Sequence, residues 1–223
     1  MSIWIIMIAV MVASFIIQQT LQSRFSKYSR VPLPSGMSGA EIAEKMLRDN
    51  GIYDVSVTSV EGRLTDHYNP KTKTVNLSRD VYNGRSVAAA AVAAHECGHA
   101  VQHAQGYLPL QLRSALVPVV TFANMTVQWV LLAGIIFLNI FPGLLWAGIA
   151  LFALSTLFSI LTLPVEVNAS ARAVAWLQSA GVTDAETRPK AIDALKWAAY
   201  TYFIAAIGSL ATLFYYISIA NRR

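Results

Sequence analysis

Residues 114–165 read SALVPVVTFANMTVQWVLLAGIIFLNIFPGLLWAGIALFALSTLFSILTLPV and contain no Asp, Glu, Lys, Arg or His. These 52 residues are enough for two membrane-spanning helices, because each needs about 20 apolar residues to cross the hydrocarbon of a bilayer. Pro142 and Gly143, near the middle, are typical of a turn. The stretch therefore predicts a transmembrane hairpin over residues 114–164.

Two further apolar stretches lie outside this hairpin. Residues 3–17 are almost purely apolar, and residues 197–220 carry no charge. No Lys or Arg precedes the first stretch and no small-x-small site follows it, so we expect an uncleaved anchor over residues 1–21 rather than a cleaved secretory signal. With 55% hydrophobic and 13% charged residues, the chain is predicted to be a mainly α integral membrane protein with about four transmembrane helices.

The basic residues predict the orientation in the membrane. If four helices cross, residues 24–113 and 165–196 share one side and hold 15 of the 17 Lys and Arg, leaving Arg222 and Arg223 on the other. Loops rich in Lys and Arg stay inside, so both segments are expected in the cytoplasm and both termini outside. The basic residues form no run longer than two, which argues against a nucleic-acid partner.

The hydrophilic segments show local signals for helices and strands. Ser38 and Glu41 match a capping box that opens a short helix. Alternating β-formers predict a small antiparallel sheet of about three strands. The predicted strands are 53–60, 63–68 and 74–77, and the predicted helices are 38–50, 86–105, 168–180 and one that begins near Thr183 or Pro189 and continues into the last span.

One motif in the helix predicted over residues 86–105 carries chemistry. His95-Glu96-Cys97-Gly98-His99 is an H-E-x-x-H sequence. Residues four apart share one face of a helix, so His95 and His99 can bind one zinc ion while Glu96 lies beside them as a general base. The ordinary alternative is a pair of surface histidines with a solvated glutamate.

A catalytic zinc ion needs a third protein ligand and an open position for water. His103 is unsuitable, because eight helical residues place it about 12 Å from His95. The other candidates are His67, Glu166 and the scattered acidic residues. Glu166 lies at the end of an apolar span, where an unpaired carboxylate is costly and a metal would neutralise it. The alternative for Glu166 is an ion pair with an arginine such as Arg172.

Residues outside the metal motif suggest how a substrate binds. His67 and Tyr68 lie on a predicted strand. An edge strand in a peptidase can pair with an extended substrate, and a nearby His or Tyr can stabilise an oxyanion. An ordinary strand histidine is the alternative. Cys97, the one cysteine, is expected to be a small packing residue, and it excludes an internal disulfide and fits a reducing compartment.

Several segments together resemble a known family. HECGHAVQ at 95–102, DHYNP at 66–70, DVYNGRS at 80–86 and LPVE at 163–166 are similar to segments of the YugP-type membrane zinc metallopeptidases, and more distantly the chain is similar to HtpX-like peptidases with a gluzincin-type site. The resemblance implies that Glu166 is the third ligand of one zinc ion. Two departures are Ser170, where the distant group has Asp, and Asn168, where an acid is expected; both concern ligand orientation.

From these observations we expect a membrane-bound endopeptidase. Its substrate would be a peptide or membrane protein, its location a bacterial plasma membrane with the active site facing the cytoplasm, and its role membrane-protein quality control or processing. A homo-oligomer or a membrane partner is possible. The alternatives are an intramembrane-cleaving protease and a non-catalytic zinc-containing scaffold. The expected layout is an anchor at 1–21, a zincin-like α+β cytoplasmic domain at 22–113, a hairpin at 114–164, a cytoplasmic helical segment at 165–196 and a last transmembrane helix at 197–223.

Overall fold

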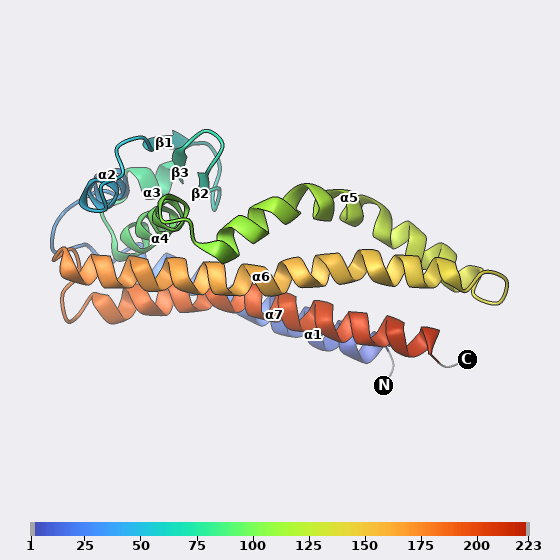
Figure 1. Cartoon of the computed structure of the whole chain (residues 1–223). Coiled ribbons are helices and arrows are strands. Elements are labelled where there is room, and N and C mark those ends of the chain that lie inside the picture. Colours follow the sequence, from blue (N-terminus) through green and yellow to red (C-terminus); the bar gives the residue numbers. More distant parts are fainter. Residues whose placement is uncertain (1–2, 222–223) are drawn as a thin grey trace.

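Four long apolar helices dominate the computed structural model, which describes residues 3–221. They are α1 (Ile3–Tyr28), α5 (Leu108–Ile136), α6 (Gly143–Ser179) and α7 (Arg188–Ala220). Each is long and apolar enough to cross a membrane, as the sequence predicted. The start of α1, the end of α7 and the turn between α5 and α6 lie towards one end of the molecule, and a small folded unit lies at the other (Figure 1). Arg222 and Arg223 lie outside the described residues.

The hairpin of α5 and α6 turns where the sequence predicted, at Pro142 and Gly143. A Cβ added to Gly134 of α5 would lie 2.6 Å from Leu145 Cα of α6, so the two backbones are in direct contact there. Beyond this contact α5 arches away from α6 in its middle and returns to it near its start (Figure 1). Pro118 lies inside α5, and a proline removes a helical hydrogen bond and bends the helix.

The small unit lies between α1 and α5 in the sequence. Its elements are α2 (Gly39–Asp49), β1 (Ser56–Val60), β2 (His67–Asn69), β3 (Thr74–Ser78), α3 (Arg79–Tyr82) and α4 (Val87–Ala104). The predicted capping box is present: the Glu41 N–H donates to Ser38 Oγ, and the Ser38 N–H donates to the Glu41 carboxylate. Both helices predicted in this part of the chain are therefore formed, as α2 and α4.

The sheet differs from the prediction. Its strand order is β1-β3-β2, with β1 parallel to β3 and β2 antiparallel to β3. The prediction of an antiparallel sheet was wrong for β1, and residues 61–66 form a crossover instead of a hairpin turn. Val75 and Leu77 make β3 the buried strand, so β3 takes the centre. β2 is consequently an edge strand, and this matters for the site.

The helices α6 and α7 are longer than predicted. The helix expected over residues 168–180 is the second half of α6, which runs through Pro164 without a break. The packing of α6 against α4, α5 and α7 holds the helix together at this proline. α7 begins at Arg188 with Pro189 in its first turn, and it continues into the last span. This start is the second of the two that the sequence predicted.

The small unit shares its core with the ends of the long helices. Buried residues of α2, β3 and α4 form one cluster with Ala173 and Leu177 of α6 and Leu195 of α7. In addition, the Trp176 indole N–H donates to an Asp49 carboxylate oxygen at 3.0 Å, which ties α6 to α2. The unit is therefore built onto α6 and α7, and this packing positions the candidate site.

Candidate metal centre

Helix α4 places His95 and His99 side by side. The helix begins at Ser86, whose hydroxyl accepts the Ala89 N–H at 3.3 Å, and continues through a run of alanines, the strongest helix formers. His95 and His99 are one turn apart, and their ring centroids are 4.8 Å apart. The local sequence alone thus aligns both imidazoles on one face.

Glu166 comes from α6, which lies against α4 at this point. Gly98, between the two histidines, allows the close approach: a Cβ there would lie 2.6 Å from the Ala169 carbonyl oxygen. Glycine is therefore the residue that lets the backbone of α6 come near enough for a short carboxylate side chain to reach both imidazoles.

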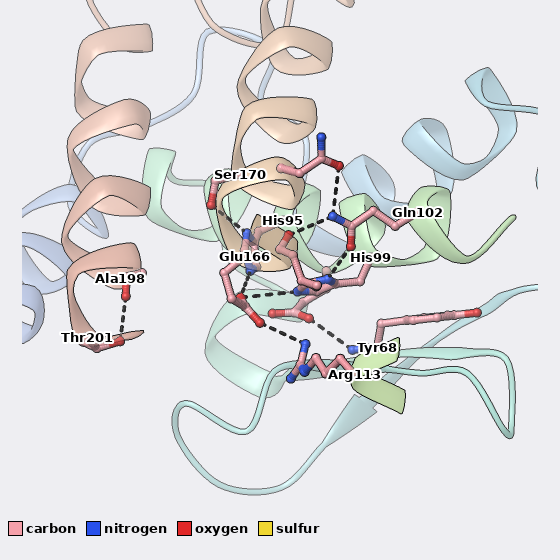
Figure 2. Close-up of polar contacts among 12 residues, drawn as sticks. Tyr68, His95, His99, Gln102, Arg113, Glu166, Ser170, Ala198 and Thr201 are labelled. Carbon is pink, nitrogen blue, oxygen red and sulfur yellow. Dashed lines mark hydrogen bonds and ion pairs between the residues drawn. The ribbon is translucent and has the colours of Figure 1, made fainter. Parts of the chain in front are cut away.

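The three side chains converge on one point (Figure 2). Glu166 Oε2 lies 3.2 Å from His95 Nε2 and 3.5 Å from His99 Nε2. Zinc binds such atoms at ~2.0–2.1 Å in a tetrahedron, which places ligand atoms roughly 3.3 Å apart. Glu166 and His99 are buried and His95 is nearly so. The spacing, the burial and the N, N, O donor set all fit one zinc ion with a position left for water.

The charges around the cluster also favour a cation. Burial by itself lowers the pKa of His99, but the hydrogen bond that its ring donates to the Glu166 carboxylate and the charges of Glu96 and Glu166 outweigh it and raise the pKa above its ordinary value. The site thus stabilises positive charge between two buried carboxylates. A divalent cation would supply this positive charge and leave both imidazoles neutral, as metal ligation requires.

Hydrogen bonds fix the outer nitrogen of each imidazole. Ser170 Oγ lies 3.1 Å from His95 Nδ1, and Gln102 Oε1 lies 3.0 Å from His99 Nδ1. The Gln102 amide donates in turn to the Val165 carbonyl at 2.8 Å and to Asn168 Oδ1 at 3.0 Å. With Nδ1 engaged, Nε2 of each ring is directed at the cluster. Ser170 and Asn168, the two departures from the family pattern, thus contact His95 directly and His99 through Gln102.

Two contributors were missed in the sequence. Arg113 Nη1 lies 3.1 Å from Glu166 Oε1, so one carboxylate oxygen faces the histidines and the other is held by a guanidinium. Arg113 and Glu166 are the charged residues at the two ends of the uncharged stretch, and a hairpin brings them to one level. Gln102 lies one turn after His99 and is fully buried.

The ion pair suggested as an alternative for Glu166 involves a different arginine. Arg172 donates to Asn168 Oδ1 and to Gln105 Oε1, each at 2.7 Å, instead of to Glu166. The alternative was therefore right that an arginine pairs with Glu166 and wrong about which one.

Glu96 is buried beside the cluster and is held by the edge strand. Its Oε2 accepts the backbone N–H of Tyr68 at 3.1 Å. Because β2 pairs with β3 on its other side, this N–H belongs to the unpaired edge of the sheet. The edge of β2 thus runs past the carboxylate that the motif marks as the general base.

The side chains of His67 and Tyr68 point to other partners. His67 is exposed, with Nδ1 at 2.7 Å from the Thr65 carbonyl and Nε2 at 3.2 Å from Asn76 Nδ2. The Tyr68 hydroxyl lies 2.7 Å from Nδ1 of His103, which is exposed as expected. The structure thus brings the backbone of β2 to the site, and neither of these two side chains.

Cys97 packs on the opposite side of α4. It is fully buried, and its Sγ lies 3.5 Å from the Ala43 carbonyl oxygen of α2. Burial raises the pKa of the Cys97 thiol far above the ordinary value. The residue is therefore an inert packing thiol, as the sequence suggested.

The chain resembles known proteins along almost its whole length. Residues 3–221 match a family model described as "Putative neutral zinc metallopeptidase". The chain is 42% identical over 212 residues to the "Putative membrane protease YugP" of Bacillus subtilis (strain 168), and the match covers 95% of this chain and 93% of that protein. No solved structure matches the chain.

Proposed function

The chain belongs to this family of neutral zinc metallopeptidases, and from this premise we propose that it is an endopeptidase that cleaves peptide bonds at the cytoplasmic face of a bacterial plasma membrane. The observation that carries the proposal is the convergence of His95, His99 and Glu166 on one point beside the buried Glu96. Three protein ligands with an adjacent carboxylate are typical of a hydrolytic zinc site, whereas a structural zinc site usually has four protein ligands.

Each residue of the site has a role in this hydrolysis. His95, His99 and Glu166 would hold a zinc ion, which supplies a Lewis acid that polarises a carbonyl and lowers the pKa of a water molecule. Glu96 takes the proton of the attacking water and passes it to the departing amine. The Tyr68 N–H aims the Glu96 carboxylate, and Arg113 holds Glu166 from the side away from the histidines.

The substrate backbone would bind along β2. This strand has a neighbour on one side only, and the edge at Tyr68 faces Glu96. An extended peptide that adds to this edge lies next to the reacting groups. We therefore propose that the substrate backbone binds at Tyr68, whereas the exposed His67, which contacts Asn76 of β3, would meet the substrate only through its side chain.

The site would lie where the long helices leave the bilayer. Arg113 and Glu166 end the uncharged part of the hairpin, and Arg24 and Lys196 end the uncharged parts of α1 and α7. An ion pair is costly at the centre of the hydrocarbon, so we place the level of Arg113 and Glu166 at the boundary of the hydrocarbon. This supports membrane proteins as substrates, in quality control or processing, and disfavours cleavage within the bilayer.

A zinc-containing scaffold without turnover is the competing reading. Structural zinc usually has four protein ligands. Among residues 3–221, the group of His, Cys, Asp and Glu side chains that could hold a metal has three members. A fourth protein ligand on the metal would favour the scaffold.

The test compares Glu96→Gln with the wild type and with Glu44→Gln, a matched change at an exposed position of α2. Each full-length protein is purified in detergent and assayed for bound zinc and for peptide hydrolysis. We expect Glu96→Gln to keep its zinc and to lose activity by about 10²–10⁴-fold, because an amide cannot accept the proton. Glu44→Gln should match the wild type. Equal activity in the Glu96 variant and the wild type would exclude this mechanism.

A further inference from the structure

A cavity of about 560 Å³ opens directly beside the candidate metal centre, with His95 and Glu96 in its wall. The rest of the wall comes from α1, α4 and α7, from the crossover between β1 and β2, and from Ser78 of β3 and Asp80 of α3. Ala198 of α7 lies in this wall, and Figure 2 shows it on the helix to the left of the cluster. The cavity therefore connects the reacting groups with the surface where α1 and α7 pack together.

The wall near the membrane helices is apolar. Leu21 and Phe25 of α1, Val92 of α4 and Leu195 and Ala198 of α7 all line it. Binding pockets for organic ligands commonly measure 300–1,000 Å³ and have mainly apolar linings with few polar groups. The volume therefore exceeds what one small side chain needs and is sufficient for a residue of the size of leucine or phenylalanine.

The charged groups of the wall away from the candidate metal centre have protein partners. Asp66 accepts the Ser78 N–H at 2.8 Å and the Ser78 hydroxyl at 3.0 Å. Arg63 forms an ion pair with Asp80 at 3.6 Å. These groups are occupied by protein partners, so the cavity offers little to bind a charged ligand and its lining selects an apolar one.

From this arrangement we infer that the cavity receives a large apolar side chain of the substrate residue next to the scissile bond. The inference rests on the proposed peptidase function and gives it a specificity: bonds flanked by a large apolar residue, in segments that leave the bilayer near α1 and α7. Arg24, beside the α1 wall, pairs with Asp193 of α7 at 3.5 Å, which places this wall at the membrane boundary.

The mouth of the cavity carries a strained residue. Leu64 lines the cavity with its side chain 58% exposed and has φ of 59°. A left-handed leucine is sterically unfavourable, and such strain is concentrated at functional sites. The exposed leucine therefore adds an apolar contact surface to the cavity lining.

The test uses the full-length zinc-loaded protein in detergent. Cut sites in a mixed peptide pool are read by mass spectrometry, and kcat/KM is then measured for two peptides that differ only by Leu or Gly beside the cut bond. We expect the wild type to prefer Leu by at least about tenfold. Ala198→Trp, which fills the cavity, should reduce the Leu-to-Gly ratio towards one. The control is Ala205→Trp, an exposed position of α7 outside the cavity wall.

A second variant guards against a folding defect in Ala198→Trp. Leu64→Gly removes the exposed side chain at a backbone angle that glycine adopts freely, and it should lower the Leu-to-Gly ratio by less. Equal cleavage of both peptides by the wild type would overturn the inference and leave the peptidase intact. Equal loss for both peptides in Ala198→Trp, together with an unchanged Leu-to-Gly ratio in Leu64→Gly, would likewise overturn the inference. Absence of zinc-dependent cleavage of any peptide would instead overturn the proposed function itself.

Discussion

Helices α4 and α6 contribute to the same site in different ways. α4 supplies His95, Glu96 and His99 within five consecutive residues, so the helical repeat alone sets their spacing. α6 supplies Glu166 from a distant part of the chain, and its position depends on the contact between the two helices. The comparison teaches that the pair of histidines is a local property of the sequence, whereas the complete ligand set is a property of the packed protein.

The largest expected effect comes from removing the contribution of α6. Glu166→Ala leaves the two histidines of α4 in place but deletes the third ligand, so zinc affinity should fall by more than the ~10–100-fold that accompanies the loss of an outer contact. Isothermal titration with zinc measures this directly. Glu186→Ala, an exposed change next to α7, serves as the control. Undiminished affinity in Glu166→Ala would place the third ligand elsewhere.

The next largest effect is expected from a substitution that moves α4 and α6 apart without removing a ligand. In Gly98→Ala the new methyl would meet the Ala169 carbonyl, and because it cannot fit, α6 must shift and carry Glu166 away from the histidines. We expect zinc affinity to drop by roughly tenfold or more although alanine favours the helix. Cys97→Ala, which faces α2 on the other side of α4, should keep its affinity. If Gly98→Ala bound zinc normally, the close helix contact would be unnecessary.

A smaller effect is expected from the contacts that α6 makes to α4. Ser170→Ala removes the partner of His95 Nδ1 and should weaken zinc binding by about tenfold, the lower end of the range for such contacts. Ser170→Asp should bind at least as well as the wild type, since a carboxylate accepts the same hydrogen bond more strongly. Ser179→Ala near the end of α6 is the control. Equal affinities for all three would mean that His95 is oriented by packing alone.

The smallest effect concerns the end of α4 beyond the motif. His103 is exposed and bonded to the Tyr68 hydroxyl, so His103→Gln should change zinc affinity and activity by no more than about twofold, as for an ordinary surface substitution. The same assays with His99→Gln should show loss of zinc. A large loss of zinc in His103→Gln would make His103 part of the metal site.

The sequence predicts the features that depend on neighbouring residues. The four spans follow from uncharged length, the capping box follows from Ser38 and Glu41, and the alignment of His95 with His99 follows from helical spacing. The position of Glu166 at the end of an apolar span made it one of several candidates for the third ligand, and the resemblance to a family implied that it is the one.

The features that were wrong or missed depend on contacts between distant segments. The alternation of β1 and β2 gives no information on which strand takes the centre, so the parallel pairing of β1 with β3 was not foreseen. The hairpin was predicted to end at residue 164, but packing on three sides carries α6 through Pro164. Arg113 became recognisable only when the hairpin placed it opposite Glu166.

The uninterrupted course of α6 has a consequence for how this protein can be handled. Gly143–Ser179 is one helix, and Glu166 lies within it with no loop between the apolar half and the half that contacts α4. A truncated, water-soluble version that ends before the hairpin would lack this carboxylate, and one that starts within α6 would leave a frayed, unsupported helix end near it. The apolar hairpin is thus a structural component of the candidate metal centre, and purification has to keep both together.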